Sequence, residues 1–321
     1  MKAVRVHTVG GPEALVYEDV PDPKIEAAQV VIRIEATGVN FAEVYARRGS
    51  TPQPLPIAIG NEGAGTIVEV AQDVSDLKPG DRVAFYGTPG AYAELIAVPA
   101  ARVVKLPDGI STKLAAASLL QGMTAHYLAI NTYPLHPGDI CLVHAAAGGV
   151  GLLLCQMAKQ RGARVIGTVS TDEKANAARE AGADEVILYT KVPFDEEVKR
   201  LTDGRGVDVV YDSVGKTTFL QGFNCLRPRG YMVLYGQSSG AIDPIDVGLL
   251  NRGSFFVTRP TLVHHGVERK ELEWRSGEIF DWIASDKLKV RIHSEFPLRD
   301  AAKAQAALEQ RETIGKVLLI P

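Results

Sequence analysis

The stretch that decides the fold is Cys141-Leu142-Val143-His144-Ala145-Ala146-Ala147-Gly148-Gly149-Val150-Gly151. An apolar segment typical of a buried strand runs into a turn of small residues, and an amphipathic helical pattern follows. Small residues let a backbone approach a pyrophosphate closely, and the N–H groups and dipole of a helix N-terminus favour its negative charge. Against the G-x-G-x-x-G pattern, Ala146 replaces the first glycine, followed by Gly148 and Gly151. A turn that merely packs a helix on a sheet is the alternative, but the strand before and the helix after favour a dinucleotide site.

The chain downstream of this turn alternates between short apolar runs and helical patterns. Strands are expected at 140–146, 164–169, 185–188, 207–211, 230–235 and 254–258, and helices at 150–161, 172–181, 194–202 and 217–225. Such alternation predicts βαβ units and a parallel sheet covered by helices on both faces. The fold class is therefore α/β, with a doubly wound parallel sheet.

The first hundred residues are β-rich instead. Short β-favouring runs at 4–8, 29–37, 65–70, 81–85 and 91–98 are separated by Pro and Gly clusters, and a helical pattern interrupts them at 41–47. The tail predicts helices at 271–284 and 300–309 and a last strand at 316–320. No internal repeat or low-complexity linker is visible.

Composition excludes several function classes. The 321 residues are 46% hydrophobic and 23% charged, with a net charge of −3, so no basic footprint for nucleic acid is present. Three scattered cysteines form neither a disulfide framework nor a cysteine metal cage and fit a reducing compartment. The most apolar stretch, 140–158, is interrupted by polar residues and glycines, so no membrane span is expected. With no export signal visible, we expect the cytoplasm.

The end of the second expected strand indicates which dinucleotide binds. NAD-preferring folds usually place an acidic residue about 20 residues beyond the glycines to bind the ribose hydroxyls. Here Ser170 stands at that point, and Lys174 follows one helical turn later. A hydroxyl and a cation would hold a 2′-phosphate, and the Tyr189 hydroxyl could join them. These residues favour NADPH, whereas the nearby Asp172 argues the other way.

Many motifs now stand in one order along the whole chain, and together they resemble one family. They are Gly38-Val39-Asn40-Phe41 with Tyr45, Gly60-Asn61-Glu62-Gly63-Ala64-Gly65, Pro79-Gly80-Asp81-Arg82-Val83, Gly90-Ala91-Tyr92-Ala93-Glu94, Ala145 to Gly151, Tyr211-Asp212-Ser213-Val214-Gly215, Val257-Thr258-Arg259-Pro260 and Gly315-Lys316-Val317-Leu318. The chain resembles the zinc-free NADPH:quinone oxidoreductases, relatives of zeta-crystallin within the medium-chain dehydrogenase/reductase superfamily.

The resemblance implies a GroES-like β-rich barrel domain made of residues 1–121 and 262–321, with a Rossmann-type NADP-binding domain, residues 122–261, inserted in it. It also implies a cofactor in the cleft between the domains. The cofactor-binding residues carried over are Asn40, Thr124, Gly148, Gly149, Val150, Ser170, Thr171, Lys174, Tyr189, Ser213, Val214, Tyr235, Gly236, Gln237, Phe256, Val257, Thr258 and Arg311. Family members commonly dimerise by joining strands of this sheet, here 255–258, so a homodimer is expected.

No metal site is expected. Where zinc-dependent members of the superfamily carry a Cys and a His ligand, this chain has Asn40 and Asn61. An Asn amide is a poor zinc ligand beside thiolate and imidazole. Without a Lewis acid, the acceptor must bring its own electrophilicity, as a quinone does. Asn40 and Tyr45 are the catalytic candidates: either could donate a hydrogen bond to the acceptor oxygen, and Tyr45 could pass a proton or only shape the pocket.

Two other functions remain open. A 2-enoyl or alkenal reductase would use the same fold and NADPH, with Tyr45 as proton donor, and assays with quinones, alkenals and enoyl thioesters would separate the two. An RNA-binding or structural, crystallin-like role belongs to another class. The near-neutral charge disfavours RNA binding, which a filter-binding salt titration would test.

Overall fold

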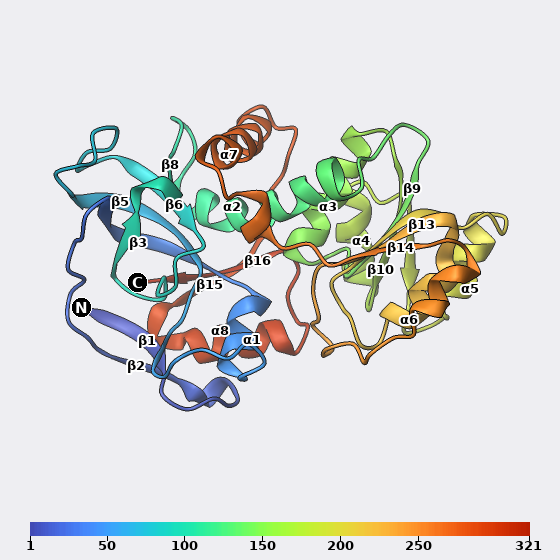
Figure 1. Cartoon of the computed structure of the whole chain (residues 1–321), viewed down its shortest axis with the longest axis horizontal. Helices are drawn as coiled ribbons and strands as arrows, with labels where there is room; N and C mark the ends of the chain where they lie inside the picture. Colours follow the sequence, from blue (N-terminus) through green and yellow to red (C-terminus); the bar gives the residue numbers. More distant parts are fainter. The chain divides into compact units, whose positions relative to one another are not determined.

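The computed structural model describes all residues, 1–321 (Figure 1). The chain divides into two compact units: a β-rich unit made of Met1–Met123 and Gly266–Pro321, and an α/β unit made of Thr124–His265. The boundaries expected from the sequence were 121/122 and 261/262. The middle of the chain thus forms one unit, and the two ends together form the other.

The α/β unit is built on a six-stranded, all-parallel sheet with strand order β11-β10-β9-β12-β13-β14. Its strands are β9 (Ile140–His144), β10 (Arg164–Val169), β11 (Glu185–Leu188), β12 (Val207–Asp212), β13 (Leu226–Leu234) and β14 (Phe256–Thr258). The connecting helices are α3 (Gly149–Gln160), α4 (Asp172–Glu180), α5 (Phe194–Leu201) and α6 (Phe219–Gly222). The doubly wound parallel sheet expected from the alternating pattern is confirmed.

Helices cover both faces of this sheet. Leu142, Ile166 and Met232, from three different strands, share one buried cluster with Phe194 of α5 and Phe219 of α6. The helices α3 and α4 contact each other and pack on β9, β10 and β11; Figure 1 shows them on the side of the strands away from α5 and α6. Because successive strand residues point to opposite faces, strands buried this way must be apolar throughout.

One expected helix is much shorter in the structure. The pattern over 217–225 gives only the four-residue α6, followed by a 3₁₀ turn at Phe223–Cys225. The chain bends close to the sheet here: a Cβ on Gly222 would lie 2.5 Å from Met232 Cε of β13. The missing side chain at Gly222 permits this close approach, and the tight turn replaces a regular helix.

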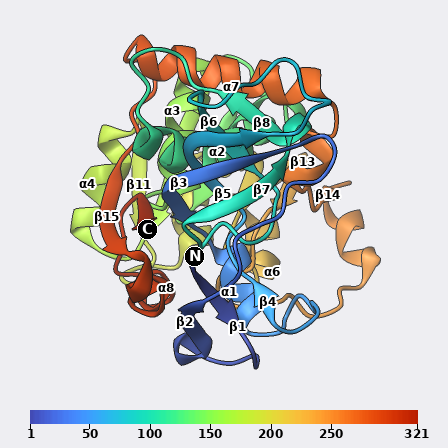
Figure 2. The same cartoon turned by 90° about the vertical axis from the view of Figure 1, so that its left-hand side faces the viewer.

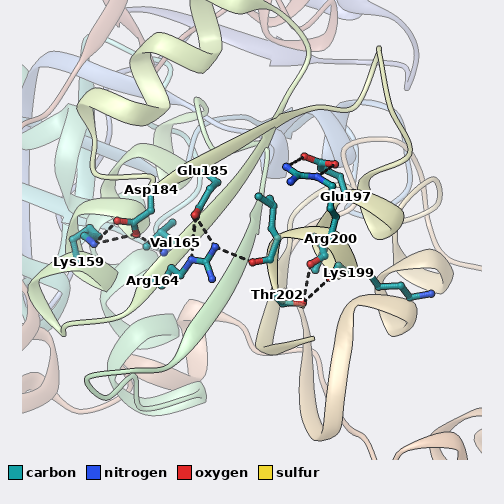
Figure 3. A network of polar contacts seen from close by, with 11 residues as sticks. Lys159, Arg164, Val165, Asp184, Glu185, Glu197, Lys199, Arg200 and Thr202 are labelled. Carbon is teal, nitrogen blue, oxygen red and sulfur yellow. Dashed lines mark hydrogen bonds and ion pairs between the residues drawn. The ribbon is translucent and has the colours of Figure 1, made fainter. Parts of the chain in front are cut away.

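The amino-terminal ends of β10 and β11 carry a polar network (Figure 3). Arg164, the first residue of β10, pairs with Glu185, the first of β11, at 2.7 Å, and Lys159 pairs with Asp184 at 2.7 Å. Asp184 also accepts a hydrogen bond from the Val165 backbone at 2.8 Å. These ion pairs are partly exposed and fix the strand starts; the cofactor residues expected between Ser170 and Thr258 lie toward the opposite ends of the strands.

The β-rich unit contains a seven-stranded sheet and a three-stranded sheet. The larger has the order β15-β16-β3-β5-β6-β8 with β7 paired to β3, and the smaller has the order β2-β1-β4. Their bounds are β1 (Lys2–Val6), β2 (Leu15–Asp19), β3 (Gln29–Val39), β4 (Ile57–Ala58), β5 (Glu62–Val70), β6 (Arg82–Tyr86), β7 (Leu95–Pro99), β8 (Val103–Lys105), β15 (Ile292–Pro297) and β16 (Lys316–Ile320).

Four helices accompany these strands: α1 (Phe41–Arg47), α2 (Thr112–Tyr127), α7 (Arg269–Ala284) and α8 (Ala301–Glu309), with the end of α2 reaching into the α/β unit. Figure 2 shows the β-rich unit, with α8 lying beside β15. The last strand, β16, runs antiparallel to β3, pairing Val317 with Val39 and Leu318 with Gly38. This pairing brings the C-terminal strand against the segment that leads into α1.

Candidate active site

The glycine-rich turn joins β9 to α3 within four residues. Ala145 has φ +51°, the left-handed conformation, and the Ala146 backbone N–H donates to Thr168 O at 3.1 Å, tying the turn to β10. In the G-x-G-x-x-G pattern, Ala146 stands at the position of the first glycine, but the residue with the left-handed conformation is Ala145. Ala146 is instead buried beside Gly167, where an added Cβ would lie only 2.8 Å from the Ala146 Cβ.

Two glycines allow the helix to start close to this turn. A Cβ on Gly151 would lie 2.3 Å from Ala145 O, and one on Gly148 would lie 3.2 Å from the same oxygen. Gly148 caps α3 without a side-chain hydrogen bond, and α3 begins at Gly149. Because the first N–H groups of a helix lack intrahelical acceptors, this end offers backbone donors to an anion.

The other residues predicted to bind the cofactor follow the ends of the parallel strands. Ser170 follows β10, Tyr189 follows β11, Ser213 follows β12, Tyr235 follows β13, and Thr258 ends β14. In a parallel sheet these carboxyl ends form one edge, and ligands bind there, at the point where the strand order reverses. That point lies between β9 and β12. The structure thus collects these residues along one edge of one sheet.

The loops after β10 and β11 are linked to each other. Thr171 caps α4 by accepting a hydrogen bond from the Lys174 backbone at 3.3 Å, and Thr190 Oγ1 donates to Ser170 O at 3.0 Å. The Tyr189 side chain is 39% exposed, which leaves it accessible to a ligand.

Asp172, the residue that argued against a phosphate in this region, has a counter-charge. Its carboxylate pairs with Lys191 Nζ at 3.2 Å, and both side chains are well exposed. Lys191, in the loop after β11, is a further cation at Asp172 that the sequence reasoning missed. Its only signal was its place just after Tyr189, at the end of the third expected strand.

The loops after β12 and β13 are fixed by one buried carboxylate. Asp212 accepts hydrogen bonds from the Val214 N–H at 2.7 Å and the Gly215 N–H at 3.0 Å. The Tyr235 N–H donates to Asp212 O at 2.8 Å, and a Cβ on Gly236 would lie 2.6 Å from Ser213 O. The two loops therefore pack closely on each other and hold their backbone groups in place.

Gln237 and Phe256, the next cofactor candidates along this edge, have partners of their own. Gln237 Oε1 accepts from Arg259 Nη2 at 2.8 Å. The Phe256 ring stacks on Tyr231 with centroids 4.5 Å apart and remains 49% exposed. Both side chains are held by neighbours within the α/β unit.

The two Asn residues at the zinc-ligand positions belong to a buried polar cluster in the β-rich unit. Asn40 caps α1 in a capping box with Glu43, whose carboxylate accepts from the Asn40 N–H at 2.7 Å. Asn40 Nδ2 donates to Glu62 Oε1 at 2.8 Å, and Asn61 Nδ2 donates to Glu43 Oε1 at 3.1 Å. Both amides thus act as hydrogen-bonding groups with fixed partners.

The charges of this cluster are almost completely withdrawn from solvent. Glu43 is fully buried, and Glu62 and Lys316 are each 1% exposed. Burial raises the pKa of the Glu43 carboxyl to about 7, helped by the neighbouring charge of Glu62 and opposed by the ammonium of Lys316. Glu62 Oε2 also accepts from the Leu120 N–H at 3.1 Å, so this side chain holds the backbone of α2 as well as the Asn40 amide. Sequence reasoning had not singled out Glu43 or Lys316.

The remaining candidates are Tyr45, Thr124 and Arg311. Tyr45 is partly buried on α1, and its ring lies 6.1 Å from that of Phe41. Thr124 is 8% exposed near the end of α2. Arg311 is exposed just beyond α8, with φ +60°.

No three His, Cys, Asp or Glu side chains come together in an arrangement that could hold a metal ion. None of the helices combines the length and apolar character needed to cross a membrane. The three cysteines are buried and unpaired.

Comparison with known proteins gives matches along the whole chain. The family model described as "Alcohol dehydrogenase GroES-like domain" matches residues 26–108, and the one described as "Zinc-binding dehydrogenase" matches residues 149–276, a range without Asn40 and Asn61. The quinone oxidoreductase of Pseudomonas aeruginosa is 42% identical over 323 residues, covering 100% of this chain and 99% of that protein. The 2-haloacrylate reductase of a Burkholderia species is 42% identical over 331 residues, covering 99% and 98%.

One solved structure connects the fold to a cofactor. The crystal structure of Escherichia coli quinone oxidoreductase complexed with NADPH superimposes with a TM-score of 0.97 at 43% identity, covering 100% of both chains. The expected architecture, a Rossmann-type sheet inserted in the sequence of a GroES-like domain, is confirmed by these matches.

Proposed function

The chain belongs to the quinone oxidoreductase family of the medium-chain dehydrogenase/reductase superfamily, and from this membership we propose that it reduces quinones with NADPH and without a metal. One observation carries the proposal. The positions that hold zinc ligands in metal-dependent members are Asn40 and Asn61, each hydrogen-bonded to a buried carboxylate. The site is built from hydrogen-bond donors, and the acceptor must be reducible without a Lewis acid.

The carboxyl edge of the α/β unit fits NADPH. The glycine turn keeps side chains away from the start of α3, where Gly148, Gly149 and Val150 would hold the pyrophosphate. Ser170, Thr171, Lys174 and Tyr189 would hold the 2′-phosphate, with Lys191 as an additional cation. The other contacts that we propose are Thr124, Ser213, Val214, Tyr235, Gly236, Gln237, Phe256, Val257, Thr258, Arg311 and Asn40.

The bound cofactor supplies a hydride, and the chain supplies orientation and hydrogen bonds. We assign Asn40 Nδ2 as the donor to the acceptor oxygen that gains negative charge, because this amide is held by buried partners in one orientation. Tyr45, four residues beyond the start of α1, either passes a proton to the acceptor or forms a wall that shapes the pocket. Replacing Tyr45 by Phe separates these roles, because only the first loses rate.

Reduction of electron-poor alkenes is the second candidate. It is favoured by the 42% identity to a 2-haloacrylate reductase, whose name describes a substrate with a double bond conjugated to a carboxylate. Both reactions place negative charge on an oxygen conjugated to the carbon or ring that receives the hydride, so the same donor would serve either one.

An acceptor panel tests the proposal. NADPH oxidation is measured with 1,4-benzoquinone, 1,2-naphthoquinone, 2-alkenals, enoyl thioesters and 2-chloroacrylate, with an unactivated ketone as negative control. We expect the highest kcat/KM with a quinone and no turnover of the ketone. A higher kcat/KM with 2-chloroacrylate or an alkenal would establish the second candidate, and turnover of the ketone would contradict metal-free reduction.

We also propose a cytoplasmic homodimer. The edge strand β14 pairs with β13 on one side only, and Phe256 and Val257 are 49% and 38% exposed. An open edge strand with apolar side chains is suited to pairing with a second copy. Light scattering coupled to size-exclusion chromatography should give twice the chain mass of 34.5 kDa, and a single-chain mass would contradict the dimer.

A further inference from the structure

Lys316 is buried next to Asn40 although the two are far apart in the sequence. Its Nζ lies 2.8 Å from Asn40 Oδ1 and 2.5 Å from Glu62 Oε1. The pairing of β16 with β3 carries the lysine there, and Gly38 leaves the space for it. A Cβ on Gly38 would lie 2.6 Å from Lys316 Nζ and 2.2 Å from Glu62 Oε1.

These contacts fix the direction of the Asn40 amide. Oδ1 accepts from Lys316, from Gln121 Nε2 at 3.2 Å and from the Glu43 backbone in the capping box, while Nδ2 donates to Glu62. A reversed amide would place its NH₂ against the ammonium and its oxygen against the carboxylate, which is electrostatically unfavourable. An amide nitrogen has two N–H donors, and the contact with Glu62 uses one of them.

We propose that Lys316 is a positioning residue of the reduction: its ammonium, held by Glu62, orients and polarises the Asn40 amide so that the second Nδ2 N–H donates to the acceptor oxygen. This inference rests on the proposed function. Reduction of a quinone to a hydroquinone takes up one hydride from NADPH and one proton from Tyr45 or solvent. Lys316 supplies neither.

The reason is electrostatic. A cation beside the amide oxygen withdraws electron density from the amide, and the N–H becomes a stronger donor to a developing oxyanion. Interactions of this kind are strong where water is excluded, and Lys316 and Glu62 are each only 1% exposed. The ammonium therefore provides, through Asn40, a fixed positive field in a site whose ligand positions are unsuited to zinc.

The kinetic test uses paired variants. Lys316→Met alone would leave Glu62 buried without its counter-charge and could unfold the chain. The double variant Lys316→Met/Glu62→Gln removes both charges and is called the uncharged pair. Lys316→Arg keeps the positive charge. Lys113→Met is the matched control, because it removes the lysine of a surface pair, Lys113–Glu295 at 2.6 Å. Circular dichroism and NADPH affinity establish that each variant is folded.

We expect kcat with a quinone to fall about tenfold in the uncharged pair, with the KM for NADPH unchanged. The loss should be larger for a methylated, less electrophilic quinone than for 1,4-benzoquinone, because the weaker acceptor depends more on the donor. Lys316→Arg should recover part of the rate, and in an Asn40→Ala background removal of the pair should have little further effect. A folded Lys316→Met/Glu62→Gln variant with wild-type kcat would overturn the proposal. The proposal would also be overturned if removing the pair lowered kcat by the same factor in the Asn40→Ala background as in the wild type.

A second readout needs no activity. In ¹⁵N-labelled protein without ligand, the two Nδ2 protons of Asn40 should exchange with solvent about tenfold faster in the Lys316→Met/Glu62→Gln variant than in the wild type. The NMR chemical shifts of these protons should also change. Unchanged exchange and shifts would show that Lys316 does not hold the amide. If the wild-type enzyme reduces no quinone, the proposed function is wrong. The exchange data alone would then decide whether Lys316 orients the Asn40 amide.

Discussion

Glu43 shows at the scale of one residue how burial sets a charge state in this protein. Its carboxyl is fully buried, caps the start of α1, and faces Lys316, Glu62, Asn40, Asn61 and the ring of Tyr92. Burial raises its pKa from 4.5 to about 7, so the folded protein keeps a proton that the unfolded chain releases. Stability therefore decreases as the pH rises from 4.5 to 7, and the deficit is complete above that range.

Glu43→Gln should remove this pH dependence. Gln mimics the protonated carboxyl and does not titrate. The free energy of unfolding of the variant minus that of the wild type should therefore be up to about 3 kcal/mol larger at pH 8 than at pH 5. Urea unfolding at the two pH values measures the difference, with Glu69→Gln on the exposed part of β5 as control. The same stability difference at both pH values would show that Glu43 titrates normally.

Lys174→Ala should discriminate between the two nicotinamide cofactors. If Lys174 pairs with the 2′-phosphate, the KM for NADPH should rise about tenfold or more, while that for NADH, which lacks the phosphate, should hardly change. Lys199→Ala is the matched control, because this exposed lysine of α5 lies at the polar network and extends away from it (Figure 3). Equal effects on both cofactors would reject the phosphate assignment.

Some of these residues could be found from the sequence, and others could not. Asn40 was identified because it stands at a position defined by a family motif. Lys316 lies 276 residues away from it, and only the pairing of β16 with β3 brings the two together. The buried state of Glu43 depends on packing within the β-rich unit, which no local pattern encodes.

At the scale of elements, the carboxyl edge of the sheet is the part of the account that sequence predicts best. Alternating strands and helices and a small-residue turn are local signals, and they suffice to predict a doubly wound parallel sheet. The helix over 217–225 was predicted too long, because Gly222 allows the chain to approach Met232 instead of continuing the helix. Strands β2 and β15 were missed; neither contains a fully buried residue, so neither shows the apolar run of a core strand.

Two glycines of α3 should respond differently to valine. Gly149→Val places a branched side chain at the helix start, where the pyrophosphate would approach, so NADPH affinity should fall by more than about tenfold with little loss of stability. Gly151→Val should destabilise the protein itself, because its Cβ would lie 2.3 Å from Ala145 O. Gly277→Ala, in open space on α7, is the control.

Calorimetry and thermal unfolding of these variants separate binding from folding. Unchanged NADPH affinity in a folded Gly149→Val protein would remove the turn from the cofactor site. A Gly151→Val protein as stable as the wild type would show that the turn can move away from α3.

At the scale of the whole molecule, two compact units come from one chain whose ends fold together. The sequence pattern separated a β-rich start from a regularly alternating middle, and the resemblance to the family implied that the tail joins the start. The exact boundaries depend on which residues contact each unit, and they fall at 123/124 and 265/266. The two family models follow the same division, with the GroES-like model matching residues 26–108 and the "Zinc-binding dehydrogenase" model matching residues 149–276.

We propose that the glycine turn and the loops of the carboxyl edge bind a reduced pyridine nucleotide that carries a 2′-phosphate. Isothermal titration of the wild-type protein with NADPH, and separately with NADH, tests it without any assumption about the acceptor. We expect a heat that saturates at one NADPH per chain and an affinity for NADH that is weaker by about tenfold or more. Absence of binding heat with NADPH, or equal affinities for the two nucleotides, would contradict it.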